Sequence, residues 1–114
     1  MTVTIYHNPR CSKSRAALKY LEDEKIEFDL VTYLDGNLTA DGIAAILASL
    51  GMSAKDVMRK GEKIYKQLGL ENEVDEAKLI AAIATNPILL ERPIVVRDGK
   101  AAIARPLENV MALF

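Results

Sequence analysis

Hydrophobic positions along the chain follow two spacings, and these spacings predict the order of the elements. Alternation over residues 3–6 predicts a strand, and the apolar residues that follow it predict a helix over about 11–23. A second short strand is predicted over 27–31. Because a strand, a helix and a strand follow one another closely, we expect the two strands to be parallel neighbours.

The middle of the chain has helical spacing throughout. Thr39 is expected to cap a helix that Gly51 ends. Its apolar residues stand at i, i+3, i+4 and i+7: Ile43, Ile46, Leu47 and Leu50. Ser53 and Asp56 resemble a capping box that starts a short helix. Further helices are predicted over 62–68 and 75–85.

The last part of the chain is expected to form a hairpin. Strands over 94–96 and 101–104 flank Asp98-Gly99, a dipeptide typical of a type I′ turn. Pro106 is expected to open a final helix over 107–113. The order β-α-β, helices, β-β-α predicts an α/β protein with a mixed sheet and a thioredoxin-like fold. We expect one domain, 1–114, with a helical insertion at about 38–88.

Composition excludes several classes of function. Fifteen basic and 16 acidic side chains give a net charge of −1, so no basic field favours general nucleic-acid binding. One histidine and one cysteine exclude a structural zinc site, and no other metal site is expected. The longest apolar runs, 43–48 and 79–84, are too short to cross a membrane. With no recognisable signal peptide and a single cysteine, we expect a cytoplasmic protein. We also expect a monomer, because the apolar residues are mostly explained by core faces.

Cys11 is the main candidate for chemistry, because it stands where the first strand turns into a helix. A thiol at a helix N-terminus faces unpaired backbone N–H groups and the positive end of the helix dipole, which favour the reactive thiolate. Neighbouring side chains are expected to add positive charge: His7, Arg10, Lys13 and Arg15. The alternative is a small buried hydrophobe, the commonest role of a free cysteine, which this polar setting disfavours.

The spacing around Cys11 excludes some cysteine chemistries. A phosphatase loop needs arginine six residues after the cysteine, where this chain has Ala17. A Cys-x-x-Cys site needs a second cysteine, where it has Ser14, so a redox cycle needs a thiol from another molecule. His7 has no acyl-transfer signature around it and is expected to tune the thiol rather than to act as a protease base.

Three arginines stand at predicted element boundaries, where a scaffold can present functional groups. They are Arg59, Arg92 and Arg105. In a thioredoxin-like fold the Arg92-Pro93 junction lies beside the Cys11 loop, and its peptide bond is a candidate for cis. Three guanidinium groups around a thiolate would bind a tetrahedral oxyanion in line for attack by sulfur.

Six motifs, in this order and spacing, carry a resemblance that spans nearly the whole chain. They are Tyr6-His7-Asn8-Pro9-x-Cys11-x-x-Ser14-Arg15, Met58-Arg59-Lys60, Tyr65-x-x-Leu68-Gly69-Leu70, Asn86-Pro87-Ile88-Leu89, Glu91-Arg92-Pro93-Ile94-Val95-Val96 and Arg105-Pro106. The chain resembles the glutaredoxin-linked arsenate reductases, the ArsC family, in a wider group that also holds the Spx-type regulators.

The resemblance implies a role for each matching residue. Cys11 would be the catalytic cysteine, and the three boundary arginines would hold the oxyanion and the arsenic–thiol adducts. The residues that would support the thiolate are His7, Asn8, Ser14 and Arg15. The implied activity is reduction of arsenate, or a similar oxyanion, to arsenite in arsenic resistance. Glutathione would be a co-substrate and glutaredoxin a partner, with no tightly bound cofactor.

The loop departs from the family pattern at two positions. Arg10 and Ser12 replace a small residue and a glycine, and Arg10 adds bulk and charge at the mouth of the site. The alternative function is a redox-linked binding or regulatory protein of the Spx type without turnover. Those regulators carry Cys-x-x-Cys, so Ser14 argues against that role.

Overall fold

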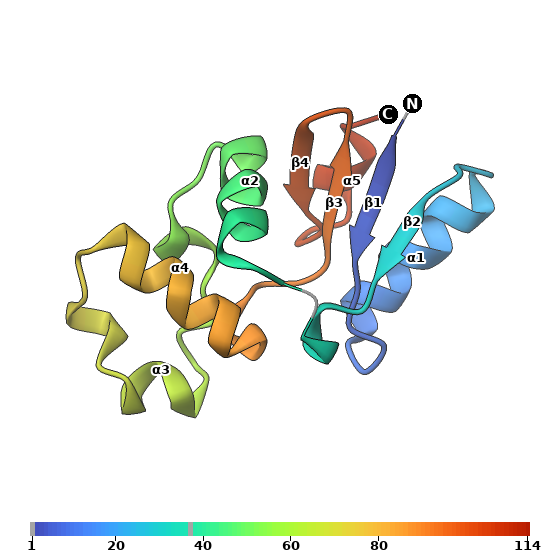
Figure 1. Cartoon of the computed structure of the whole chain (residues 1–114). Helices are drawn as coiled ribbons and strands as arrows, with labels where there is room; N and C mark the ends of the chain where they lie inside the picture. The colour runs from blue at the N-terminus through green and yellow to red at the C-terminus, as the bar shows by residue number, and fades with distance from the viewer. Residues whose placement is uncertain (1, 37) are drawn as a thin grey trace. The chain divides into compact units, whose positions relative to one another are not determined.

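The computed structural model describes residues 2–36 and 38–114, which fall into two compact units (Figure 1). One unit combines residues 2–36 with 92–114, and the other is Leu38–Glu91. The second unit therefore contains the helical segment expected at about 38–88. The assignment of the whole chain to one domain stays a prediction.

The first unit is built on a four-stranded mixed sheet in the order β2-β1-β3-β4 (Figure 1). Its strands are β1 (Val3–Tyr6), β2 (Asp29–Val31), β3 (Ile94–Arg97) and β4 (Lys100–Ile103). β1 runs parallel to β2 and antiparallel to β3, which confirms the predicted parallel pairing. The order of elements expected from the sequence is thus observed.

The second strand is shorter than the predicted 27–31. Thr4 pairs with Asp29, so Glu27 would stand opposite residue 2, before β1 begins at Val3. Phe28 would stand opposite Val3 in this register, but regular pairing starts only at Asp29.

Two helices cover one face of this sheet. α1 (Ser12–Asp23) and α5 (Glu108–Met111) contribute to a single buried cluster with the strands. The buried members of this cluster are Val3, Ile5, Ala17, Leu21, Val95, Ala104 and Val110. Burial of the valine, isoleucine and leucine side chains of this cluster stabilises the unit by about 1.5–3 kcal/mol each.

The hairpin and the last helix differ in how well their sequence predicted them. Asp98 and Gly99 have φ of 49° and 85°, as a type I′ turn requires, so the predicted turn is confirmed. The final helix covers four residues instead of 107–113, because only the N–H groups of Met111 and Ala112 make α-helical bonds, whereas those of Asn109, Val110, Leu113 and Phe114 bond to the carbonyl three residues earlier. The expected place of Pro106 in its first helical turn is wrong, since Pro106 precedes Leu107, the N-cap.

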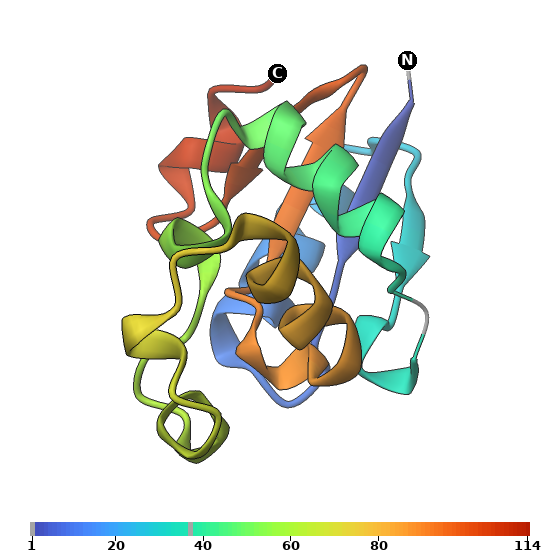
Figure 2. The ribbon, with the colours of Figure 1, turned by 60° about the vertical axis from the view of Figure 1, so that its left-hand side comes forward.

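The second unit is helical. It contains α2 (Ala40–Leu50), α3 (Lys63–Gln67) and α4 (Glu76–Thr85), and Figure 2 shows α2 and α4 next to each other. Short 3₁₀ turns complete the chain: η1 (Tyr33–Asp35) in the first unit, and η2 (Ala54–Val57), η3 (Leu70–Asn72) and η4 (Pro87–Leu89) in the second. Within the described ranges, no helix has the length and apolar character that a membrane span needs.

The predicted helix signals of the second unit are confirmed. The Gly42 N–H donates to Thr39 Oγ1 at 3.0 Å, and Gly51 ends α2 with φ of 68°. The Ser53–Asp56 capping box is present as well, but it starts a 3₁₀ turn rather than an α-helix.

Candidate active site

Cys11 occupies the N-cap position of α1, at the end of the loop that follows β1. Its N–H donates to the Asn8 carbonyl at 3.0 Å, and its own carbonyl accepts the Arg15 N–H at 3.0 Å. These bonds fix the sulfur at the start of the helix. The residue is 8 % exposed, so it is nearly buried, and the first turn of α1 contains no acidic residue.

Opposing effects act on the pKa of the Cys11 thiol, and the balance lowers it below the ordinary value. Burial is the largest single effect and raises the pKa. The backbone N–H groups of Ser14 and Lys13 bond to the sulfur, and the charges of Arg92 and Arg105 favour the anion. The four favourable contributions outweigh burial, so the thiolate is favoured more than in an ordinary cysteine.

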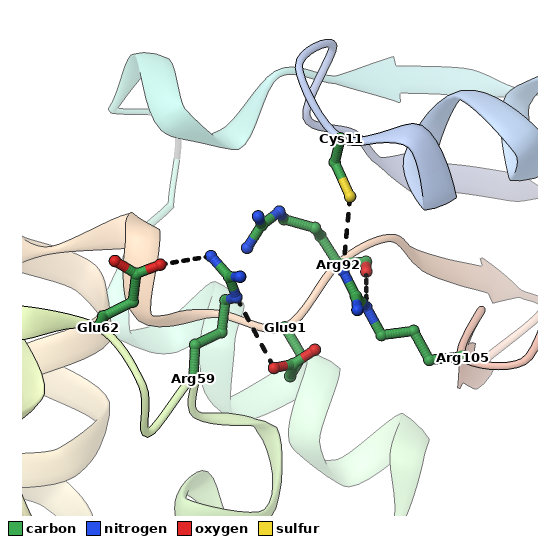
Figure 3. A network of polar contacts seen from close by, with 6 residues as sticks. All are labelled: Cys11, Arg59, Glu62, Glu91, Arg92 and Arg105. Carbon is green, nitrogen blue, oxygen red and sulfur yellow. Dashed lines mark hydrogen bonds and ion pairs between the residues drawn. The ribbon is translucent and has the colours of Figure 1, made fainter.

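Arg105 contacts both the sulfur and the backbone next to it. Its Nη2 lies 3.5 Å from Cys11 Sγ, and its Nε donates to the Arg92 carbonyl at 2.8 Å (Figure 3). The β3–β4 register explains why Arg92 and Arg105 are close to each other. Ile94 stands opposite Ile103, so Arg92, just before β3, and Arg105, just after β4, lie at the same open end of the hairpin.

Arg92 places two buried hydrogen-bond donors in this region. Its Nε and Nη1 have no hydrogen-bond partner among the described residues. Buried guanidinium donors without an acceptor are costly, so such a group is suited to receive an anion. The Arg92-Pro93 peptide, a candidate for cis although X-Pro bonds are usually trans, is cis, and so is Arg105-Pro106, for which we had no expectation.

Three polar residues are buried beneath the Cys11 loop: His7, Asn8 and Ser14. A hydrogen bond of 2.6 Å joins Ser14 Oγ and His7 Nδ1, and Ser14 Oγ also accepts the Asn8 N–H at 2.9 Å. Asn8 Oδ1 in turn accepts the Arg10 N–H at 3.0 Å. This network holds the loop from below, and Ser14 reaches the sulfur through its backbone N–H.

The expected positive charge of His7 is wrong at neutral pH. Burial lowers the pKa of His7 and the charge of Arg15 lowers it further, whereas the hydrogen bond with Ser14 acts in the opposite direction. The net shift is downward from 6.5, so the imidazole is neutral at pH 7.

The cations next to Cys11 in sequence are not those that act on it. Arg10, Lys13 and Arg15 are exposed, and Arg15 Nη1 donates to the Pro9 carbonyl at 2.9 Å. The side-chain charges that lower the Cys11 pKa belong to Arg92 and Arg105, more than 80 residues away in sequence. Tertiary structure, rather than the local run of basic residues, supplies the field.

Arg59 belongs to the second unit, where it is paired with carboxylates. Its Nη1 lies 2.5 Å from Glu62 Oε1, and its Nε lies 3.8 Å from Glu91 Oε1 (Figure 3). The structure therefore brings together Cys11, Arg92 and Arg105 within the first unit, and it places Arg59 in an acidic environment of its own. Glu62 was not singled out from the sequence, and Glu91 was named there only as part of a motif, although the i, i+3 spacing of Arg59 and Glu62 is a signal for such a pair.

Comparison with known proteins gives consistent matches over nearly the full length. Residues 6–113 match the model of the ArsC family. An arsenate reductase from Neisseria meningitidis serogroup A is 50 % identical over 113 residues, which is 97 % of each chain. The uncharacterized protein YfgD from Escherichia coli K12 is 47 % identical, over 97 % of this chain and 95 % of that one.

Solved structures agree with these matches. The structure of an arsenate reductase from Vibrio cholerae has a TM-score of 0.95 at 39 % identity, and it covers 100 % of this chain and 98 % of that one. The predicted thioredoxin-like α/β fold is confirmed by this likeness.

Proposed function

Because this chain belongs to the ArsC family, we propose that it is an arsenate reductase that converts arsenate to arsenite. The proteins from Neisseria meningitidis and Vibrio cholerae carry that name. The observation that carries the proposal is the position of the Cys11 sulfur at a helix N-terminus, 3.5 Å from the Arg105 guanidinium. A nucleophile beside a cationic anion-binding group is the arrangement that attack on an oxyanion requires.

In this proposal the arginines bind the oxyanion. The two buried donors of Arg92 would gain acceptors from arsenate oxygens, and Arg105 would contribute a second guanidinium beside the sulfur. Arg59 is proposed as the third anion-binding residue, on the resemblance of its motif. His7, Asn8, Ser14 and Arg15 are proposed to support the loop that carries the thiolate.

The proposed reaction starts with attack of the Cys11 thiolate on arsenic(V). A sulfur–arsenic bond forms, and one arsenate oxygen leaves as hydroxide, which takes a proton to become water. The thiolate of glutathione then attacks the Cys11 sulfur and forms a disulfide. The electron pair of the broken sulfur–arsenic bond stays on arsenic, which is reduced from the +5 to the +3 state and leaves as arsenite.

Glutaredoxin is proposed to restore Cys11. Its thiolate attacks the glutathione sulfur of the mixed disulfide and releases the Cys11 thiolate. A chain with one cysteine needs such an external thiol, because it lacks a second cysteine of its own. We place this reaction in the cytoplasm, with a monomeric protein and no tightly bound cofactor.

A coupled assay tests the proposal. The full chain is incubated with arsenate, glutathione and glutaredoxin, and arsenite is measured directly. Turnover that disappears in Cys11→Ser supports a reductase. A protein of the Spx-type regulatory class instead predicts a glutathionylated Cys11 with no arsenite, and that result would reject the proposed reaction.

A further inference from the structure

The backbone around Arg59 is held by two short hydrogen bonds to the segment that ends the second unit. The Arg59 N–H donates to the Leu89 carbonyl at 2.7 Å, and the Glu91 N–H donates to the Val57 carbonyl at 2.7 Å. Between them, Met58 and Leu90 form an antiparallel bridge. Arg59 and Glu91 are thus fixed relative to each other by main chain.

Glu62 makes the closest contact with the guanidinium. It lies on a turn in which its N–H donates to the Arg59 carbonyl at 3.2 Å, and it is the N-cap residue of α3. Its carboxylate forms a hydrogen-bonded ion pair with Arg59 Nη1 at 2.5 Å. The Glu91 carboxylate is further away, at 3.8 Å from Nε. Charge-assisted bonds of this kind are about twice as strong as neutral ones.

The side chains of this cluster are partly buried, so solvent and salt screen their charges less than at an exposed site. Arg59 is 24 % exposed, Glu62 30 % and Glu91 26 %. They line a hollow of about 240 Å³ together with Lys60 and Gly61. Two carboxylates on one guanidinium leave Arg59 more than neutralised, whereas Arg92 has two buried donors without a hydrogen-bond partner in the described chain.

We infer that Glu62 competes with an oxyanion for the Arg59 guanidinium and so lowers the affinity of Arg59 for anions. An anion that binds the Arg59 guanidinium has to displace the Glu62 carboxylate from Nη1, and the repulsion between them adds to this cost. The inference rests on the proposed function in one respect: it takes Arg59 as an anion-binding residue.

The test is direct binding of sulfate, a tetrahedral dianion that the protein does not reduce, to the full chain by calorimetry at constant ionic strength. Glu62→Gln keeps the shape of the side chain and removes its charge, and we expect sulfate to bind about three- to tenfold more tightly. Glu27→Gln is the matched control: Glu27 is exposed in the first unit, and the same change in net charge there should leave affinity unchanged.

Two further variants show whether the gain passes through Arg59. In an Arg59→Ala background, Glu62→Gln should give no gain, because the competing pair no longer exists. Glu62→Asp keeps the charge on a side chain one methylene shorter and should fall between wild type and Glu62→Gln. Circular dichroism of each variant establishes that it is folded.

Several outcomes would overturn the inference. They are unchanged or weaker sulfate binding by Glu62→Gln, a gain that persists without Arg59, and no sulfate binding by any variant. The proposed function fails separately, because the coupled assay measures arsenite and the calorimetry needs no turnover. Tighter sulfate binding without arsenite formation would reject the reductase and keep the role of Glu62.

Discussion

The N-termini of the long helices differ between the two units. In the second unit, Thr39 Oγ1 accepts the Gly42 N–H at 3.0 Å, and Asp75 Oδ1 accepts the Ala77 N–H at 2.9 Å. Both α2 and α4 also carry an acidic residue in the first turn. In the first unit, α1 begins at Cys11, which places a sulfur rather than an oxygen at the cap, and its first turn contains no acidic residue.

The caps of α2 and α4 contribute to stability, whereas the start of α1 contributes to the reactivity of Cys11. An oxygen cap satisfies an orphan N–H group and contributes about 0.5–2 kcal/mol. At α1 that contribution is absent, and the positive end of the helix acts on a sulfur instead, where it lowers a pKa. A helix start without an oxygen cap, in a chain that caps its other long helices, therefore marks the position of the candidate nucleophile.

The largest expected effect comes from replacing the Cys11 sulfur by an oxygen. Cys11→Ser should lower arsenite formation by more than about a thousandfold, because a hydroxyl is a far weaker nucleophile than a thiolate at neutral pH. The same change should raise the free energy of unfolding by about 0.5–1 kcal/mol, since serine is a good N-cap. The coupled assay and urea unfolding measure the two effects. Retained turnover would remove Cys11 from the mechanism.

Removing a cation beside the sulfur should have the next largest effect. Arg105→Ala should lower arsenite formation by about a hundredfold, because it deletes an anion-binding group in a partly desolvated site. It should also raise the pKa of Cys11. The midpoint of the pH profile for alkylation by iodoacetamide should therefore lie at a higher pH than in wild type.

Arg10→Ala is the control for this change. Arg10 is adjacent to Cys11 in sequence, but it is exposed and is not among the groups that shift the thiol. The pH profile of alkylation should therefore stay in place. A shift as large as that of Arg105→Ala would mean that local charge, rather than the hairpin arginines, sets the pKa.

The buried network below the loop should matter for stability more than for the thiol. Ser14→Ala leaves buried partners of the hydroxyl, His7 Nδ1 and the Asn8 N–H, without their hydrogen bonds, which costs about 1–3 kcal/mol. The Cys11 pKa should change little, because the Ser14 backbone N–H is retained. Urea unfolding measures the loss, and Ser12→Ala, at an exposed site of α1, should be near neutral.

The smallest effect should come from adding an acid to the first turn of α1. Lys13→Glu makes this turn resemble those of α2 and α4, and it should slow alkylation of Cys11 at pH 7 by about two- to fivefold. Lys19→Glu makes the same change in net charge near the other end of α1, where the side chain forms an exposed pair with Asp23. Equal slowing by both variants would show that net charge, and not the helix end, is responsible.

The sequence predicted best those features that depend on a few neighbouring residues. Thr39, Gly51 and the Asp98-Gly99 turn act through their own backbone and side chains, and the structure has all three as expected. The neighbourhood of Arg92 and Arg105 also followed from the sequence, because both flank one hairpin.

Other features depend on contacts that the sequence does not display. The length of β2 depends on which residues pair with β1, and the neutral state of His7 depends mainly on burial. The carboxylates on Arg59 come from a turn and from a segment about 30 residues away, and only the first has a recognisable spacing.

The pairing of β1 with β3 has a consequence for synthesis of the chain. β1 leaves the ribosome well before its antiparallel partner, which starts at Ile94, after the whole of Leu38–Glu91 has been made. The helical unit therefore has all of its residues available before the sheet has its own. During translation the sulfur is present without the charges of Arg92 and Arg105, which lower its pKa, until both arginines have emerged, so full thiol reactivity is acquired only after the β3–β4 hairpin has been made.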